Sequence, residues 1–211
     1  FGTAEKVVST KELIDKNTLA NLKIKCIVLK HPTKKERMDY VEEMDYIVSR
    51  ESRNKFILDL CKNISGNTLC LFQLVEKHGK ILHDGMKGGE NVYFVYGGTD
   101  TEQREKIRGL VEGHTKSTTI ASYGTFSTGI NIRNINNIVL ASPSKSKIRV
   151  LQSIGRGLRT SSTKDSILIF DIADDISYGE RRNFTLNHFF ERINIYNEEQ
   201  FNYEISKVKI K

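Results

Sequence analysis

Gln152, Arg156 and Arg159 are the residues whose types and spacing point most directly to chemistry. At about 3.6 residues per turn, positions i, i+4 and i+7 share one face of a helix, which we expect to begin near Ser146. Two guanidiniums and an amide in one row suit a bound anion, because arginine keeps its charge and offers a planar fork of donors to phosphate oxygens. Gly155 would admit the close approach of another surface. A solvated basic helix is the alternative for this octapeptide taken alone.

A second group of candidate residues is rich in glycine and hydroxyl side chains and runs from 121 to 131. Backbone N–H groups exposed by glycines, with several hydroxyls alongside, can bind phosphate oxygens without reading bases. The same residue types are common in an ordinary turn after a strand, and the stretch alone fits both interpretations. Its candidate residues are Thr125, Ser127, Thr128 and Gly129.

Other reactive side chains form weaker patterns. His78 and His83 lie five residues apart and would point from divergent faces of a helix, so we expect no metal site. Asp171, Asp174 and Asp175 close an apolar run, and we interpret them as part of a solvated turn because no further acidic cluster supports two-metal chemistry. The three cysteines have no C-x-x-C spacing, which indicates reduced core residues of an intracellular protein.

The composition sets broad limits on the class of protein. A chain of 211 residues can form one well-cored α/β domain with appendages. A formal charge of +7 suits a polyanionic partner but fixes neither fold nor specificity. No apolar run approaches the roughly 18 residues of a membrane span, and no signal peptide is present, so we expect no membrane partner. The chain opens on Phe1 rather than Met, and we expect it to be part of a longer protein.

Short apolar runs alternate with helical patterns, which predicts an α/β fold with a mainly parallel sheet flanked by helices. The predicted strands are 20–30, 67–72, 91–96, 118–122, 137–141, 165–171 and 201–210. The predicted helices cover 34–65, 75–86, 100–112, the region after 146, and 187–199. The charged stretch 37–53 fits a mobile arm as well as a helix, and Thr99 or Asp100 is expected to cap the helix over 100–112. Ligands of parallel sheets bind outside the carboxyl ends of the strands, where 121–131 should lie.

The Q-x-x-G-R-x-x-R pattern of residues 152–159 resembles motif VI of superfamily 2 helicases, whose arginines reach the γ-phosphate of ATP across an interdomain cleft. Residues 121–131 resemble motif V, which contacts the nucleic-acid backbone and communicates with the nucleotide. Residues 68–72 with 77–79 resemble motif IV, and 96–104 resemble the strand and capped helix between motifs IV and V. The motifs follow the family's order, and in detail they look most like the recombination and repair helicases of T-even phages.

This resemblance implies a RecA-like three-layer domain and a set of site residues. Residues 1–34 would lead in from a first motor domain, and 35–211 would form the C-terminal RecA-like domain with a helical and strand extension. The implied catalytic residues are Arg156, Arg159 and Gln152, and the implied nucleotide contacts are Gly129, Asn131 and Gly155. The implied nucleic-acid contacts are Phe72, His78, Gly98, Thr125, Ser127 and Thr128. Asn131 is often Asp in relatives, and local packing or pairing is the alternative role of Phe72 and Arg104.

The implied function is that of the C-terminal motor domain of an ATP-dependent DNA helicase or translocase. ATP and Mg²⁺ would be held mainly by a first RecA-like domain of the same protein, because the sequence has no G-x-x-x-x-G-K-[ST] and no Walker B pair. The chain alone would then be inactive. Its partners would be single-stranded or branched DNA, and its location the cytoplasm of a phage-infected bacterium. A nucleic-acid-binding module without hydrolysis and the motor half of an RNA helicase are the alternatives.

Overall fold

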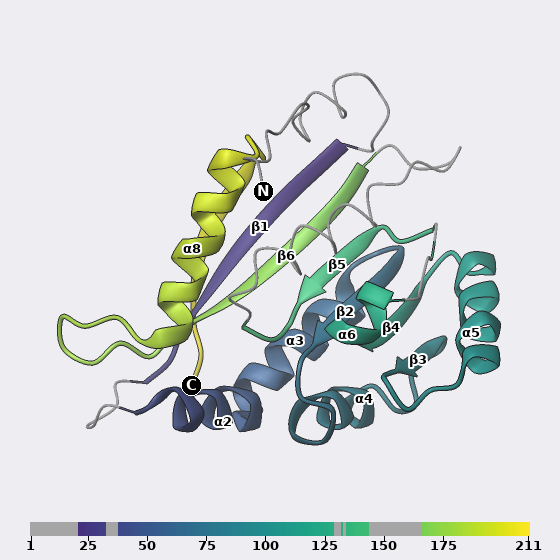
Figure 1. Cartoon of the computed structure of the whole chain (residues 1–211), viewed down its shortest axis with the longest axis horizontal. Helices are drawn as coiled ribbons and strands as arrows, with labels where there is room; N and C mark the ends of the chain where they lie inside the picture. The colour runs from purple at the N-terminus through teal and green to yellow at the C-terminus, as the bar shows by residue number, and fades with distance from the viewer. Residues whose placement is uncertain (1–20, 33–37, 129–131, 133, 144–165) are drawn as a thin grey trace, which may run out of the picture.

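The centre of the fold is a sheet of seven parallel strands in the order β3-β4-β2-β5-β6-β1-β7 (Figure 1). The computed structural model describes residues 21–32, 38–128, 132, 134–143 and 166–211, and the side chains of 126–128 are not described. The strands are β1 (Asn21–Lys30), β2 (Asn67–Phe72), β3 (Val92–Val95), β4 (Ser117–Ser122), β5 (Asn137–Leu140), β6 (Ser166–Asp175) and β7 (Tyr203–Lys209). The predicted parallel sheet is confirmed, because every described pair of neighbouring strands is parallel.

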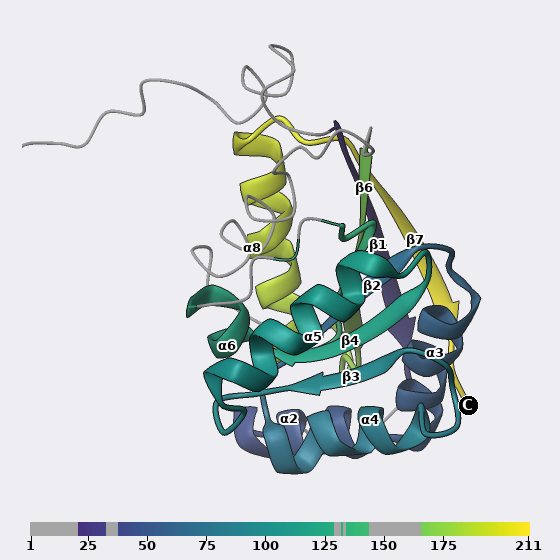
Figure 2. The ribbon, with the colours of Figure 1, turned by 90° about the vertical axis from the view of Figure 1, so that its right-hand side faces the viewer.

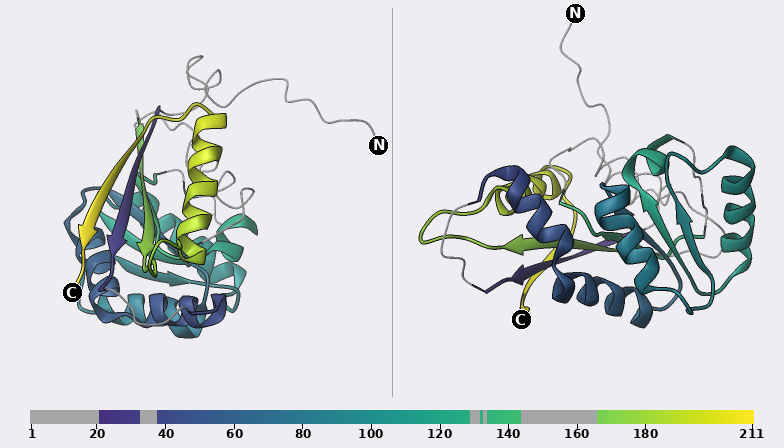
Figure 3. Two further views of the ribbon diagram at one scale, coloured as in Figure 1. Left: turned by 90° about the vertical axis from the view of Figure 1, so that its left-hand side faces the viewer. Right: turned by 90° about the horizontal axis from the view of Figure 1, so that it is seen from below.

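Helices cover both faces of the sheet and make three layers (Figures 2 and 3). One face carries α5 (Thr101–Gly113), α6 (Tyr123–Thr128) and α8 (Phe184–Glu198). The other carries α3 (Glu51–Asn63), the π-helical turn η1 (Val75–Gly79) and α4 (Lys80–Gly85). α2 (Tyr40–Ser49) lies near the carboxyl edge of the sheet, where it packs against both η1 and α8. Among the described helices, none is both long enough and apolar enough to cross a bilayer.

The apolar strands divide their side chains between two cores. In β2, Leu69 and Leu71 join the core beneath α5 and α8, whereas Cys70 and Phe72 join the core beneath α3 and α4. All six residues of β2 are buried, as expected for a central parallel strand with helices on both faces. The continuous apolar pattern over 67–72 therefore has a direct structural cause.

The first described strand lies inside the sheet rather than in a separate leading segment. β1 pairs with β6 from Asn21–Ser166 to Lys30–Asp175, and on its other side with β7. β1 therefore belongs to the same sheet as the strands that follow it, and the domain boundary after residue 34 stays a prediction. The sequence pattern placed the strand correctly, but strand pairing across the length of the chain could not be deduced from it.

The structure decides two interpretations of local sequence. Of the two interpretations of the charged stretch, the helix is confirmed from Tyr40 onward, where α2 and the start of α3 form, and Asp39 and Glu42 form a capping box at the start of α2. Residues 123–128 form the helix α6 rather than a loop. The expected cap of α5 is confirmed, since the Asp100 carboxylate accepts a hydrogen bond from the Gln103 N–H at 2.7 Å.

The acidic end of β6 differs from its interpretation as a solvated turn. β6 continues to Asp175, and the side chains of Asp171 and Asp174 are fully buried instead of lying in a solvated turn. Asp171 accepts hydrogen bonds from the Arg192 guanidinium at 2.7 to 3.1 Å and from the Tyr196 hydroxyl at 2.8 Å. Carboxylates can be buried here because both find charged or hydroxyl donors within the core.

Candidate nucleotide and nucleic-acid interface

Ser142 joins three loops at the carboxyl edge of the sheet. Its Oγ accepts a hydrogen bond from the Gln73 N–H after β2 at 3.1 Å, and it lies 2.9 Å from Nδ1 of His78. Its carbonyl oxygen accepts a hydrogen bond from the Tyr123 hydroxyl, after β4, at 3.2 Å. The loops after β2, β4 and β5 are therefore fixed to one another at the edge where parallel sheets bind ligands.

His78 is part of this interior rather than of an exposed binding surface. Its side chain is 0% exposed, and burial, reinforced by the Arg53 charge, lowers the pKa of His78 to about 3. The imidazole is therefore neutral at physiological pH and cannot attract a phosphate by charge. In this structure the imidazole contacts Ser142 in the interior, and a direct contact of His78 with nucleic acid stays a prediction.

Phe72 is also a core residue. Its ring is 0% exposed and stacks on Phe94 with centroids 5.6 Å apart. A Cβ on Gly79 would lie 2.5 Å from the Phe72 ring, so this glycine lets η1 pack directly on the strand end. In this structure the Phe72 ring packs locally, which is the alternative that the sequence left open, and its contact with nucleic acid stays a prediction. Arg104 likewise pairs locally, because its Nη2 donates to the carbonyls of Tyr96 and Gly97 at 3.4 and 3.2 Å.

Thr125 belongs to the start of α6 and is buried. Its Oγ1 lies 2.7 Å from Oγ of Ser122, and its N–H donates to the same Ser122 oxygen at 3.3 Å. Ser122 therefore caps α6, and the Thr125 hydroxyl is paired within the protein with only 3% of the residue exposed. A direct contact of the Thr125 hydroxyl with a phosphate, as predicted, would require this pair to open.

Three predicted contacts to a nucleic-acid strand remain: Gly98, Ser127 and Thr128. Gly98 is exposed, and a Cβ there would lie 2.7 Å from the Tyr96 ring. The backbones of Ser127 and Thr128 lie in α6, but their side chains are outside the described part of the chain. Gly98 is thus an accessible candidate near the carboxyl end of β3.

The predicted anion-binding residues fall outside the described residues. These residues are Gly129, Asn131, Gln152, Gly155, Arg156 and Arg159. The described residues that flank them are informative. In the sequence, residues 129–131 directly follow α6, and residues 144–165 connect Pro143 to Ser166, the first residue of β6. The described residues that precede both segments, α6 and Pro143, lie at the edge that Ser142 organises.

A buried ion pair beside this edge was missed by the sequence reasoning. Arg53 of α3 donates from Nε and Nη2 to the Asp174 carboxylate at 2.8 and 2.9 Å, and from Nη2 to the Ala141 carbonyl at 2.7 Å. Nε2 of His31, at the end of β1, lies 2.8 Å from the same carboxylate. Burial alone raises the pKa of Asp174, but the Arg53 charge and the hydrogen bonds from His31 and Arg53 outweigh it and hold that pKa below its usual value.

This ion pair fixes the backbone immediately before the predicted anion-binding segment, since Ala141 directly precedes Ser142. The sequence carried one usable indication of it, because Asp171 and Asp174 continue an apolar strand pattern and a buried carboxylate needs a charged partner. The partner itself, 121 residues away, gave no local pattern. Among the described residues, no group of three or more His, Cys, Asp or Glu side chains is arranged to hold a metal ion.

The chain is a three-layer α/β domain with an all-parallel sheet, and its match to a solved helicase structure makes it a RecA-like domain. The chain belongs to the helicase family defined by the helicase conserved C-terminal domain, whose family model matches residues 50–161. That range spans most of the described edge, from α3 to β5, together with the segment that carries Gln152, Arg156 and Arg159.

The chain is also similar to individual helicases. The ATP-dependent DNA helicase uvsW of Enterobacteria phage T4 is 35% identical over 228 residues, which cover 100% of this chain and 45% of that protein. The crystal structure of T4 UvsW matches 91% of this chain and 42% of that chain with a TM-score of 0.76 and 36% identity. The putative ATP-dependent helicase IRC3 of Saccharomyces cerevisiae is 34% identical over 113 residues, 52% of this chain and 16% of that protein. The chain thus spans less than half the length of these relatives.

Proposed function

We propose that this chain is the C-terminal motor domain of an ATP-dependent DNA helicase or translocase that acts on branched or single-stranded DNA in recombination and repair. The observation that carries the proposal is the 35% identity to the phage DNA helicase over the full length of the chain. The domain would work with an N-terminal RecA-like domain of the same protein, inside a phage-infected bacterium. The resemblance to DEAD-box domains, such as the C-terminal domain of Dbp5 at 13% identity, concerns the fold alone.

In this proposal, Arg156 and Arg159 stabilise the negative charge that develops on the transferred phosphoryl group, and Gln152 orients the phosphates or the attacking water. Bound ATP would supply the γ-phosphoryl group, with Mg²⁺ held mainly by the N-terminal domain. Two guanidiniums and an amide are chemically suited to such a polyanion. Gly129, Asn131 and Gly155 would line the nucleotide side of the cleft.

The nucleic-acid strand would lie along the carboxyl edge, near Gly98 and the end of α6. Ser127, Thr128 and backbone groups of this region would hold it by its phosphates, which requires no recognition of bases. The structure supports this path through Ser142, which contacts His78 of η1 and accepts a hydrogen bond from Tyr123, the first residue of α6. These contacts hold the two elements in a fixed relation at the carboxyl edge. Closing and opening of the two motor domains would then move the enzyme along the strand.

The experiment is an Arg159→Ala substitution in the full-length protein. We expect nucleic-acid-stimulated ATP hydrolysis to fall by about 10³- to 10⁵-fold, while affinity for a DNA strand changes by no more than a few-fold. Arg108→Ala is the matched control, because Arg108 lies on the exposed surface of α5 and pairs only with surface carboxylates. Unchanged hydrolysis in the Arg159 variant would show that the role assigned to this residue is wrong.

A second measurement tests the division of labour between the two domains. A clean preparation of the 211-residue chain should not turn over ATP, because its sequence contains no phosphate-binding P-loop. A DNA-binding module without a role in hydrolysis would instead give Arg159→Ala and wild-type proteins with the same ATPase rate.

A further inference from the structure

A short hairpin, residues 176–183, projects from the carboxyl edge between β6 and α8, at the left of Figure 1. Tyr178 and Arg181 exchange backbone hydrogen bonds of 3.2 Å in both directions. Gly179 between them has a φ of 58°, the positive value that a tight two-residue hairpin turn requires. The side chains of Tyr178 and Arg181 are therefore presented from a defined turn.

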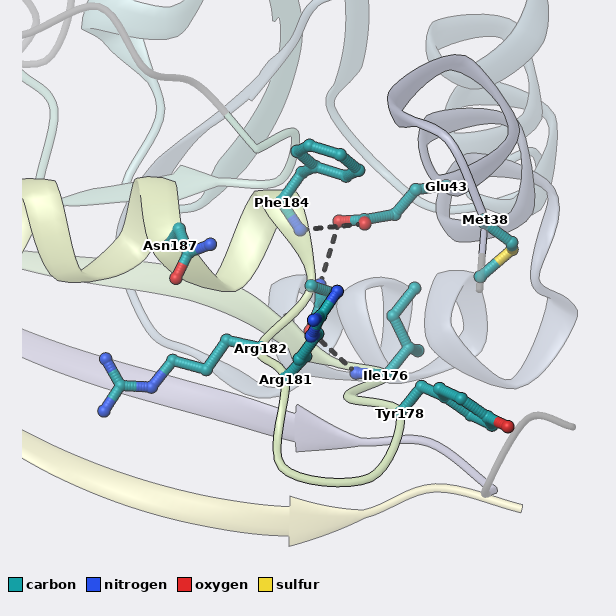
Figure 4. A pocket seen from close by; sticks show the side chains of 9 residues that line it. Met38, Glu43, Ile176, Tyr178, Arg181, Arg182, Phe184 and Asn187 are labelled. Atoms are coloured by element: carbon teal, nitrogen blue, oxygen red, sulfur yellow. Dashed lines mark hydrogen bonds between the residues drawn. The ribbon is translucent and has the colours of Figure 1, made fainter. Parts of the chain in front are cut away.

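The base of this hairpin is anchored by Glu43 of α2 (Figure 4). The Glu43 carboxylate accepts hydrogen bonds from the N–H groups of Phe184 and Thr185 at 2.9 and 2.6 Å, and from Nδ2 of Asn183 at 2.9 Å. Oδ1 of Asn183 accepts in turn from the Ile176 N–H at 3.1 Å. Because Glu43 already occupies the N-terminus of α8, that helix end is not free to bind an anionic ligand.

The cavity under the hairpin is small, with a volume of about 60 Å³. Figure 4 shows Tyr178 and Arg182 directed away from Glu43, on opposite sides of the hairpin. These two side chains therefore offer contacts on the outside of the hairpin.

The outside of the hairpin carries an aromatic ring and two guanidiniums, with Tyr178 and Arg182 on opposite sides (Figure 4), so one strand must cross the hairpin to contact both. Tyr178 is 47% exposed, and Arg181 and Arg182 are both exposed, with no ion pair to any described residue. The Arg182 guanidinium lies 4.2 Å from the centroid of the Phe190 ring, which holds it against α8. Glu180, in the turn, is exposed, and its negative charge offsets part of the positive charge of Arg181 and Arg182.

We propose that the hairpin 176–183 is a second binding surface for a nucleic-acid single strand. Tyr178 stacks on a base, and Arg181 and Arg182 contact backbone phosphates, the combination with which proteins hold single strands without sequence preference. This inference rests on the proposed function. It adds a contact beyond the track near α6, since β6 lies three strand spacings, about 14 Å, from β4 in the sheet.

The test compares full-length variants in their binding to a fluorescent oligothymidine and to a forked DNA, by anisotropy. Tyr178→Ala should weaken binding about five-fold or more, and Tyr178→Phe should bind as wild type because stacking needs only the ring. The double variant Arg181→Ala, Arg182→Ala should reduce the slope of log Kd against log salt by about 1.4, the value for two single-strand phosphate contacts. The matched control is Lys106→Ala, Arg108→Ala on α5, which should leave the slope unchanged.

The outcomes separate this inference from the proposed function. If wild-type protein neither binds DNA nor hydrolyses ATP in response to it, the proposed function fails. If wild type does both but the hairpin variants keep its affinity and salt slope, only the hairpin assignment is overturned. Loss of thermal stability in the full-length Tyr178→Ala protein with unchanged DNA affinity would show that the ring packs on another protein surface, and that also overturns the assignment.

Discussion

Arg53 holds both carboxylate oxygens of Asp174, from Nε at 2.8 Å and from Nη2 at 2.9 Å, although the two residues lie 121 positions apart. Both side chains are 0% exposed. The pair joins α3 to the end of β6, and through the Ala141 carbonyl it also reaches the end of β5. The carboxyl edge is thus held by buried charge as well as by apolar packing.

Removing one partner of this pair should strongly destabilise the protein. Arg53→Met leaves the Asp174 carboxylate buried without its main counter-charge, and we expect a loss of about 3–5 kcal/mol in the free energy of unfolding. The measurement is urea denaturation at neutral pH. Lys55→Met on the same helix is the control and should change stability by less than about 1 kcal/mol, because Lys55 pairs with Asp59 in solvent. Adding Asp174→Leu to Arg53→Met should recover part of the loss, and a double variant no more stable than the single one would contradict this account.

His78 should make stability depend on pH. Its folded-state pKa of about 3 lies below the unfolded value of about 6.5, so the unfolded chain binds a proton first as the pH falls. Stability should therefore decline from about pH 6.5 towards pH 3. Between pH 7.5 and 5.5 we expect wild type to lose about 1.4 kcal/mol more than His78→Gln, as measured by urea denaturation at each pH. Parallel pH profiles for the two proteins would show that His78 does not cause the decline.

Glu43 should contribute to the stability of α8. Its carboxylate accepts two N–H groups of the first turn of that helix, and it replaces a local side-chain cap. Glu43→Ala should lower the free energy of unfolding by about 2 kcal/mol or more, because buried donors lose their acceptor. Glu42→Ala, at the neighbouring exposed position, removes the same charge and should cost about 1 kcal/mol through the capping box of α2. Equal losses in the two variants would argue against a special role for Glu43.

Gly79 and Gly109 should respond oppositely to alanine. A methyl group at Gly79 would lie 2.5 Å from the Phe72 ring, so Gly79→Ala should destabilise the protein by about 1–3 kcal/mol. Gly109 lies within α5 with no atom within 4 Å of an added Cβ, and Gly109→Ala should stabilise by about 0.5–1 kcal/mol. Thermal unfolding of both variants checks this pair. A stable Gly79→Ala protein would mean that the Phe72 ring moves freely.

The sequence allowed the prediction of what depends on local pattern. The strands around Leu69 and Ile138, the cap at Asp100 and the parallel arrangement of the sheet were all predicted correctly, because periodicity and capping act over a few residues. The end of β6 was wrong because an Asp-rich stretch is normally solvated. Its burial depends on Arg53 and His31 at Asp174, and on Arg192 and Tyr196 at Asp171.

The sequence indicated the chemistry of the candidate site but not its burial. The structure buries both Phe72 and His78, and Phe72 shares a core with Ile57 of α3 and Leu82 of α4. Thr125 was expected to present its hydroxyl to a ligand, whereas Ser122, three residues earlier, pairs with it. No sequence pattern indicated the hairpin with Tyr178, because its exposure and its anchor at Glu43 are tertiary properties.

The place of β1 in the sheet affects how this domain can be made in a cell. Its neighbours are β6 and β7, so a ribosome must translate well over a hundred further residues before β1 finds a partner. Until then both hydrogen-bonding edges of this apolar strand are unpaired, and such edges promote aggregation and chaperone binding. The sheet can therefore be completed only late in translation, after β7 has left the ribosome and paired with β1.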